Sequence, residues 1–199
     1  ESYSGIFLVF ATLVYALQIY GDFAGYSYMA IGAAEMLGIY LPKNFDTPYF
    51  AQSIQEFWRR WHISLSTWFR DYVYFPLGGS RCAVWKKYRN VLIVFLVSGL
   101  WHGAMWNFVV WGAIHGLYQI FGGITKPLRE KMLNALRVDR GTASYRLFRM
   151  AMTFLLVDFA WLFFRADGLG AAIAMLRVIF TNLTPTALVG EAFYTMGLD

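Results

Sequence analysis

Histidine side chains in an uncharged stretch are the first candidates for chemistry in this chain. Residues 90–125 contain no Asp, Glu, Lys or Arg, and they carry His102 and His115, two of the three histidines. Each of these histidines directly precedes the second glycine of a Gly-x-x-x-Gly pair, a spacing that lets helix backbones approach closely in lipid. Each imidazole is therefore expected where two helices meet, and polar side chains at membrane depth are usually functional.

His102 is the candidate general base. Desolvation disfavours the charged imidazolium, so a buried ring stays neutral and can accept a proton from a hydroxyl group near pH 7. The alternative is a packing role beside Trp101, with the ring N–H bonded to a backbone carbonyl. His115 follows 13 residues later, about 220° around an unbroken helix. The two rings therefore need not share a face, and packing is favoured for His115.

The remaining polar candidates lie on other segments. His62 falls one turn from Arg59 on the polar side of an expected amphipathic helix, where a solvated ring that contacts head groups is an equal alternative. Asn107 could donate to an oxyanion or cap a broken helix. Asp158 and Arg165 would lie on one helix face about 10.5 Å apart, and a structural intramembrane pairing is favoured over an active site there.

The composition indicates an integral membrane protein. Apolar residues make up 58% of the 199 residues, and charged residues only 15%, which is outside the usual range of soluble domains. The net charge is +5, but the basic residues cluster between apolar runs, where membrane topology and anionic lipid head groups explain them without nucleic acid. The chain begins at Glu1 and enters an uncharged run almost at once, so we expect a piece of a longer protein.

A helical hairpin is expected to position His102. As one helix, residues 90–125 would be about 54 Å long against about 30 Å of bilayer hydrocarbon. We therefore expect a break near residues 105–107 and two arms. Basic residues flank both arms, so the positive-inside rule places the flanks in the cytoplasm and the apex outside.

The other segments are expected to surround this hairpin in an all-α fold, a polytopic transmembrane helical bundle that forms one membrane-embedded domain over residues 1–199. Thr47 as N-cap and Pro48 at the first helical position would start the amphipathic helix. The expected elements are a spanning helix at 2–21, an irregular membrane segment at 23–41, an amphipathic helix at 48–70, the hairpin at 90–125, a basic cytoplasmic loop at 126–149 and a spanning helix at 150–165.

Three functions other than an enzyme remain open on these residues alone. A bis-histidine haem carrier would use His102 and His115 on adjacent arms, although no HExxH or CxxCH motif occurs and no metal site is expected. A purely structural subunit of a membrane complex would need no functional histidine. A transporter or channel would line a pathway with acidic residues, namely Asp22, Glu35 and Asp158.

Four segments resemble motifs of the membrane-bound O-acyltransferase superfamily. The likeness is greatest to its bacterial alginate O-acetylation branch, which is related to the D-alanyl transfer protein of teichoic acids. The segments read YGDFAGYS at 20–27, FWRRWHISLSTWFRDY at 57–72, SGLWHGA at 98–104 followed by WN at 106–107, and DFAWLFFR at 158–165. They span the C-terminal portion of the usual length of the family. The first motif lacks the further small residue, often Ser, that the family has before the glycine, which leaves the polymer undecided.

The resemblance implies a multi-helix fold with a central tunnel and favours an enzyme over the alternatives. It implies transfer of an acyl group from a thioester such as acetyl-CoA to an exported polysaccharide such as alginate, in the bacterial inner membrane, with periplasmic partner proteins and no bound cofactor. By motif match the functional histidines are His102 and His62. We expect Asn107, Arg59 and Trp101 to contact the substrate.

Overall fold

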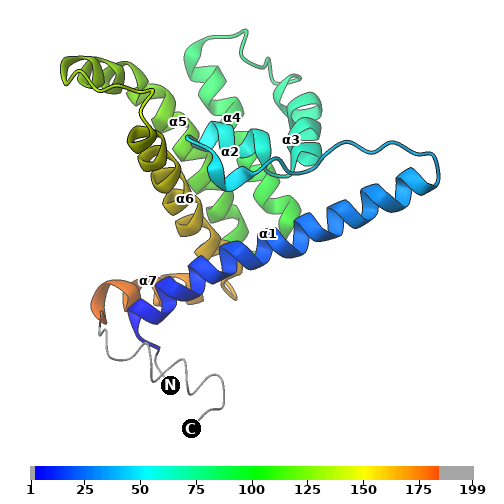
Figure 1. The fold of residues 1–199 in the computed structure, drawn as a ribbon, viewed down its shortest axis with the longest axis horizontal. Helices are drawn as coiled ribbons and strands as arrows, with labels where there is room; N and C mark the ends of the chain where they lie inside the picture. Colours follow the sequence, from blue (N-terminus) through cyan, green and yellow to red (C-terminus); the bar gives the residue numbers. More distant parts are fainter. Residues whose placement is uncertain (1–2, 184–199) are drawn as a thin grey trace.

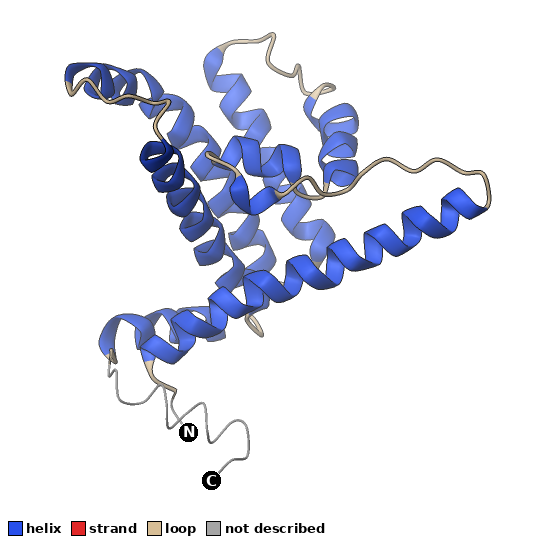
Figure 2. Ribbon diagram, in the orientation of Figure 1, coloured by secondary structure: helices blue, strands red, loops and turns tan. Residues whose placement is uncertain are grey.

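The computed structural model describes residues 3–183, and all secondary structure in that range is helical (Figures 1 and 2). The helices α1, α5 and α6 are each long and apolar enough to cross a membrane. This confirms the expected all-α membrane bundle. The elements are α1 (Gly5–Met36), the 3₁₀ turn η1 (Pro48–Phe50), α2 (Ile54–Arg60), α3 (Ile63–Phe69), the π-helical turn η2 (Arg70–Tyr74), α4 (Val84–His102), α5 (Trp106–Ala135), α6 (Ala143–Arg165) and α7 (Leu169–Thr181).

The hairpin is formed by α4 and α5, and the chain turns just after His102. The two backbones touch at glycines. A Cβ atom added to Gly99 would overlap the carbonyl oxygen of Phe108, and one added to Gly112 would overlap that of Phe95. Because any side chain at either glycine would prevent this approach, the Gly-x-x-x-Gly pairs bring the arms together. They thereby place His102 at the junction of the two helices.

The helix α1 differs from the expected elements, because one helix replaces a spanning helix at 2–21 and an irregular segment at 23–41. Its internal glycines lack side chains but keep their backbone N–H groups, so the ladder of helical hydrogen bonds continues through them. The helix ends where Gly38 adopts a left-handed φ of 73°. There the Ile39 N–H bonds the Ala34 carbonyl at 2.9 Å, which is a glycine C-cap.

Residues 48–70 form short helical pieces instead of the single amphipathic helix that was expected. Pro48 opens the turn η1, but Thr47 makes no side-chain cap. The main break lies at His62, whose φ of 45° and ψ of 56° are left-handed. Two backbone hydrogen bonds of 2.9 Å tie residues 44–46 to residues 60 and 63 on either side of this break. The pairing with a distant loop therefore overrides the local helical pattern.

The basic segment expected as a loop at 126–149 is mostly helical. Helix α5 continues through Pro127 to Ala135, and α6 already begins at Ala143. Lys, Leu, Arg, Glu and Met are strong helix formers, and they extend α5 although a proline removes one backbone hydrogen bond. The helix terminates just before Arg137, which has a left-handed φ of 51°.

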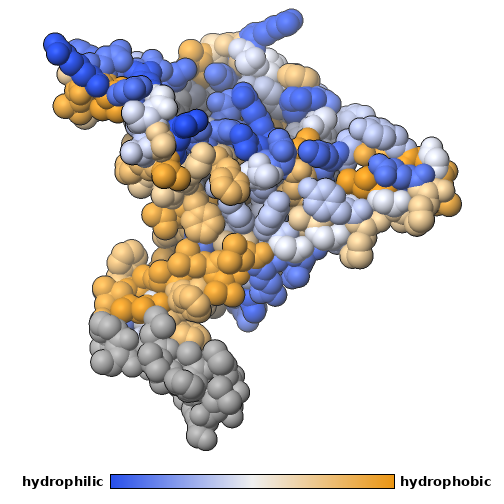
Figure 3. All heavy atoms as spheres, viewed as in Figure 1, coloured by the Kyte–Doolittle hydropathy of each residue, from blue (hydrophilic) through white to orange (hydrophobic). Residues whose placement is uncertain are grey.

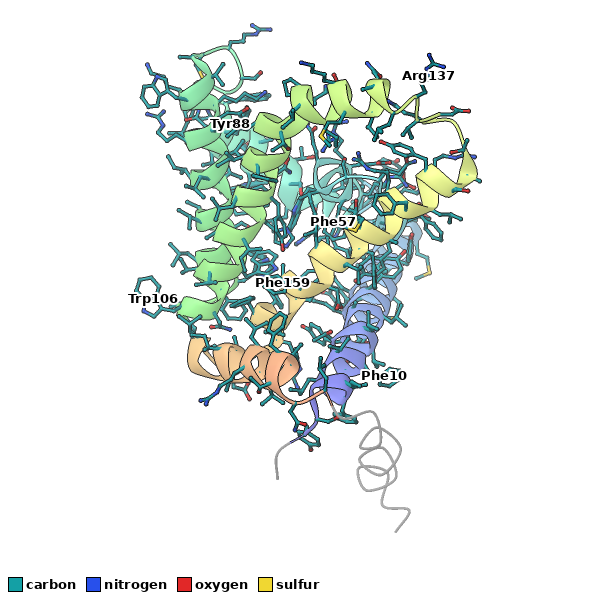
Figure 4. The ribbon with its side chains drawn as sticks, turned by 90° about the vertical axis from the view of Figure 1, so that its left-hand side faces the viewer. Phe10, Phe57, Tyr88, Trp106, Arg137 and Phe159 are labelled. Atoms are coloured by element: carbon teal, nitrogen blue, oxygen red, sulfur yellow. The ribbon has the colours of Figure 1, made fainter. Side chains whose placement is uncertain are left out.

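Polar and apolar residues separate along the molecule. Figure 4 places Arg137 at the end of the hairpin opposite Trp106. In Figure 3, hydrophilic residues gather over the far end of α5 and the start of α6, whereas hydrophobic residues cover α7 and the first half of α1. His102 therefore lies at the end of the hairpin away from the basic residues.

An aromatic core fills the space between α2, α5 and α6. Trp61, Trp111 and Trp161 are each at most 3% exposed. The ring centroid of Trp161 lies 5.1 Å from that of Trp61 and 5.9 Å from that of Trp111. Helix α1 runs obliquely past this core and contacts α6 and α7 (Figure 1). The core therefore joins the short helices of the 54–69 region to the hairpin.

Candidate active site

A cavity of about 510 Å³ opens between α1, the turn before α3 and the ends of α4 and α6. Both candidate histidines line it, although they lie 40 residues apart in the sequence. Its lining is formed by Tyr15, Gln18, Ile19, Asp22, Phe23, Tyr26, His62, Trp101, His102 and Phe164. The fold therefore gathers two imidazoles, a carboxyl group and several aromatic rings around one space.

His62 projects from the left-handed turn between α2 and α3. Its ring lies edge to face against Phe23 of α1, with centroids 4.7 Å apart and planes at 84°. The ring of Trp101 lies 6.2 Å away. Burial, with a smaller contribution from the neighbouring His102, lowers the pKa of His62 from 6.5 to about 4. The imidazole of His62 is therefore neutral at pH 7.

His102 is the last residue of α4 and is held by three aromatic rings. Its centroid lies 4.9 Å from Trp101, 5.2 Å from Trp111 and 5.1 Å from Phe164. The planes of Trp111 and Phe164 are nearly perpendicular to the imidazole, at 89° and 80°. Edge-to-face contacts of this kind restrain ring orientation. The side chain of His102 is thus fixed while one edge faces the cavity.

The ring nitrogens of both cavity histidines lack hydrogen-bond partners within residues 3–183. The alternative packing role of His102 included a hydrogen bond from the ring to a backbone carbonyl, and this bond does not form among the described residues, although the aromatic contacts of that role are present. A neutral imidazole has one donor and one acceptor nitrogen. A ring nitrogen of His62 or His102 that faces the cavity is therefore free of protein partners in this range and can donate to or accept from a bound molecule.

Only one of the three residues expected to contact substrate, Trp101, lines the cavity. Arg59 is exposed and lies outside the lining. Asn107 is completely buried, and its Nδ2 donates to the carbonyl oxygens of Phe163 at 3.2 Å and Ala166 at 3.0 Å. The last carbonyls of a helix have no partner within it, so Asn107 caps the end of α6. The helix that it caps is thus not the broken hairpin helix for which a cap was expected, and its expected contact with the substrate remains a prediction.

His115 is completely buried and lies outside the cavity. Its Nδ1 accepts a hydrogen bond from Nε1 of Trp58 at 3.2 Å. This bond ties α5 to α2, the helix that leads directly to His62. The packing role expected for His115 is therefore what the structure shows, and its contact supports the turn that carries a cavity histidine.

Sequence reasoning missed the contribution of α1. Its cavity residues recur every three or four positions and so form one stripe along a helix, at Tyr15, Gln18, Ile19, Asp22, Phe23 and Tyr26. The expected break near residue 21 hid this stripe, because it assigned the two halves to separate elements. Of the three acids considered for a transport pathway, Asp22 is the one that lines the cavity.

Asp158 and Arg165 both face α1 instead of pairing with each other. Oγ1 of Thr12 lies 2.9 Å from Oδ2 of Asp158, and the Arg165 guanidinium lies 5.9 Å from the ring centroid of Tyr15. The salt bridges among the described residues do not include either Asp158 or Arg165. The one-face geometry inferred from their spacing is compatible with these contacts, but the expected pairing is absent from the described part of the chain.

Comparison with known proteins identifies a family whose model covers most of the cavity residues. The model of the MBOAT, membrane-bound O-acyltransferase family, matches residues 2–157. The matched range contains both cavity histidines and every other lining residue except Phe164. The family match therefore covers the same part of the chain that builds the cavity.

The names of three similar proteins refer to three different polymers, alginate, peptidoglycan and teichoic acid. A probable alginate O-acetylase of Azotobacter vinelandii is 46% identical over 85% of this chain and 32% of its own length. A peptidoglycan O-acetyltransferase of Helicobacter pylori is 42% identical over 83% of this chain and 30% of its own length. A teichoic acid D-alanyltransferase of Streptococcus thermophilus is 34% identical over 76% of this chain and 39% of its own length. The chain thus spans about a third of the length of these relatives.

Proposed function

Because the chain belongs to the membrane-bound O-acyltransferase family, we propose that the whole protein transfers an acetyl group from a thioester donor to hydroxyl groups of an exported polysaccharide. The observation that carries this proposal is the pair His62 and His102, which line one cavity and whose ring nitrogens have no hydrogen-bond partner among residues 3–183. A hydroxyl group is a weak nucleophile at neutral pH, and a positioned neutral imidazole is the group that activates it.

His102 is the proposed general base. One of its ring nitrogens accepts the proton of the substrate hydroxyl while the oxygen attacks the carbonyl carbon of the thioester. The carbon–sulfur bond then breaks, and the departing thiolate takes the proton from the imidazolium. The products are an ester and a free thiol, so no oxidant, metal or further reactant is needed. Proton transfer of this kind contributes roughly 10²–10⁴ to a rate.

His62 and Trp101 are the proposed positioning groups. The imidazole of His62 remains neutral because its pKa is lowered to about 4, so it can donate one hydrogen bond to a carbonyl or hydroxyl oxygen. Trp101 contacts both histidines and supplies an aromatic wall on which a sugar face can pack.

The acceptor is a polysaccharide of the cell surface, and alginate is the first candidate. The two acetyl-transferring relatives cited above share 46% and 42% of their aligned residues with this chain, compared with 34% for the D-alanyltransferase. Acetyl is therefore favoured over D-alanyl as the group transferred. We propose acetyl-CoA or another acetyl thioester as donor, the bacterial inner membrane as location, and periplasmic proteins as partners in delivery.

Mass spectrometry of the cell-surface polysaccharide tests this function. The gene for the whole protein would be deleted and then restored, and ester-linked acetyl groups would be measured in each strain. We expect these groups to disappear on deletion and to return on complementation. Unchanged acetylation in the deletion strain would overturn the proposal. In parallel, the purified whole protein should release free thiol from acetyl-CoA only in the presence of the polysaccharide.

A further inference from the structure

Asp158 lies at the seam between α6 and α1, beside the elements that build the cavity. It is 7% exposed, and its neighbour Thr12 on α1 is 8% exposed. Oγ1 of Thr12 lies 2.9 Å from Oδ2 of Asp158 and also 2.9 Å from the carbonyl oxygen of Val9. The other carboxyl oxygen, Oδ1, is buried without a partner in residues 3–183.

The two charge states of Asp158 differ in how many protons are available for the two hydrogen bonds of the Thr12 hydroxyl oxygen. A threonine hydroxyl carries one proton. If Asp158 were ionised, its Oδ2 and the Val9 carbonyl would both be acceptors that compete for that single proton. If Asp158 carries a proton on Oδ2, it donates to Thr12, and Thr12 donates to Val9. Only the second arrangement gives each of the two 2.9 Å contacts its own proton.

Within residues 3–183, the Thr12 hydroxyl is the one direct contact that could stabilise a negative charge on Asp158. The salt bridges within 4.0 Å among the described residues do not involve it. The groups that face it are the hydroxyl of Thr12 from α1 and, more distantly, the phenol of Tyr49 from η1. Arg165, on the same helix, is placed over the ring of Tyr15 instead. A buried carboxylate at Asp158 would share the single hydroxyl proton of Thr12 with the Val9 carbonyl. Its negative charge would therefore be poorly stabilised.

We propose that Asp158 is held as a neutral carboxylic acid that donates its proton to Thr12, and that this uncharged hydrogen bond positions α1 against α6 at the wall of the active-site cavity. Thr12 lies one turn before Tyr15, the first cavity residue of α1. At Ala16, one turn after Thr12, the backbone carbonyl accepts a hydrogen bond of 2.5 Å from the Tyr49 hydroxyl. These two bonds join α1 to the rest of the bundle next to the stripe of cavity residues.

The role is one of positioning, because Asp158 is not among the residues that line the cavity. Its effect on the reaction arises from where it places the α1 stripe relative to His62 and His102. A neutral acid can be replaced by an amide, which also offers a donor and a carbonyl oxygen without charge. The inference therefore predicts that Asp158→Asn is tolerated.

Infrared spectroscopy of the purified whole protein tests the charge state directly. The difference spectrum of wild type minus Asp158→Asn at pH 7 should contain the carbonyl band of a protonated carboxylic acid. That band should shift in heavy water, because the acid proton exchanges. A difference spectrum that contains carboxylate bands instead would overturn the proposal. This measurement does not depend on the proposed acyltransferase activity.

Paired variants of the whole protein test the positioning role through polymer acetylation, a readout that rests on the proposed function. Asp158→Asn and Thr12→Ser should stay within about threefold of wild type, whereas Asp158→Leu and the isosteric Thr12→Val should lose about tenfold or more, because small displacements at an active site are costly. An Asp158→Asn protein as inactive as Asp158→Leu at equal membrane abundance would refute the inference. If wild type itself gave no acetylation, the proposed function would fail while the infrared result stood.

Discussion

His62 and His102 share one aromatic neighbour: the ring centroid of Trp101 lies 6.2 Å from that of His62 and 4.9 Å from that of His102. The two histidines come from different elements, a left-handed turn and the end of α4. They line the same cavity, so Trp101 helps to fix the relative placement of the two rings. This arrangement is the basis of the proposed division between a general base and a positioning group.

Replacement of His102 should separate catalysis from folding. We expect His102→Gln in the whole protein to lower polymer acetylation by about 10² or more at normal membrane abundance, because the general base is lost. His115→Gln is the contrasting variant, since His115 is completely buried and bonded to Trp58. Its main effect should be lower abundance. Normal acetylation by His102→Gln at normal abundance would remove His102 from the proposed mechanism.

Acid should destabilise the protein through His62. Its pKa is about 4 in the folded state against 6.5 for an unperturbed histidine. Below pH 6.5 the unfolded chain therefore binds a proton that the folded protein does not bind until about pH 4. The contribution of His62 to stability is complete above pH 6.5 and is lost as the pH falls toward 4.

The variant His62→Asn tests this dependence, because asparagine tolerates the left-handed backbone that His62 adopts. Thermal unfolding of the purified whole protein in detergent would be followed at pH 7.5 and pH 5. We expect the midpoint of wild type to fall more between these pH values than that of His62→Asn. Equal shifts in the two proteins would contradict the lowered pKa of His62.

The glycine contact of the hairpin should not tolerate a methyl group. A Cβ at Gly112 would overlap a backbone carbonyl of α4, whereas a Cβ at Gly122 on the same helix would meet nothing within 4 Å. We expect Gly112→Ala to cost about 1–3 kcal/mol or more by overpacking. Gly122→Ala is the matched control and should be neutral or stabilising by up to about 1 kcal/mol. Membrane abundance and the thermal midpoint would measure both effects, and equal behaviour of the two variants would exclude the close helix contact.

Asn107 should matter for stability more than for the chemical step. Asn107→Ala removes the side-chain donor from the Phe163 carbonyl, whereas the Ala166 carbonyl keeps its bond from the Gly168 N–H at 2.8 Å; the loss should cost about 1–3 kcal/mol. Asn134→Ala serves as control, because the exposed side chain of Asn134 near the end of α5 accepts a hydrogen bond from the exposed Arg140. The result that would restore an oxyanion role to Asn107 is a large loss of acetylation by Asn107→Ala at unchanged thermal midpoint.

The sequence alone determined the features that depend on local composition and short spacings. The long apolar runs predicted an all-helical membrane bundle, and the uncharged stretch at 90–125, too long for one span, predicted the hairpin. The Gly-x-x-x-Gly pairs predicted the helix junction at which His102 lies. Such features can be predicted because they depend on residues close together in the sequence. A segment in lipid must satisfy its backbone hydrogen bonds within its own helix, and closely spaced glycines mark where two helices can approach.

Only the tertiary structure decided which distant residues meet. The left-handed turn at His62 exists because residues 44–46 bond to both sides of it. Asn107 is a cap because the end of α6 lies beside the hairpin, and the α1 stripe faces the histidines because α1 stays helical past residue 21. Each of these relationships depends on contacts between segments far apart in the chain. The hydrophobic periodicity of one segment predicts which of its faces is buried, but it does not identify the segment against which that face packs.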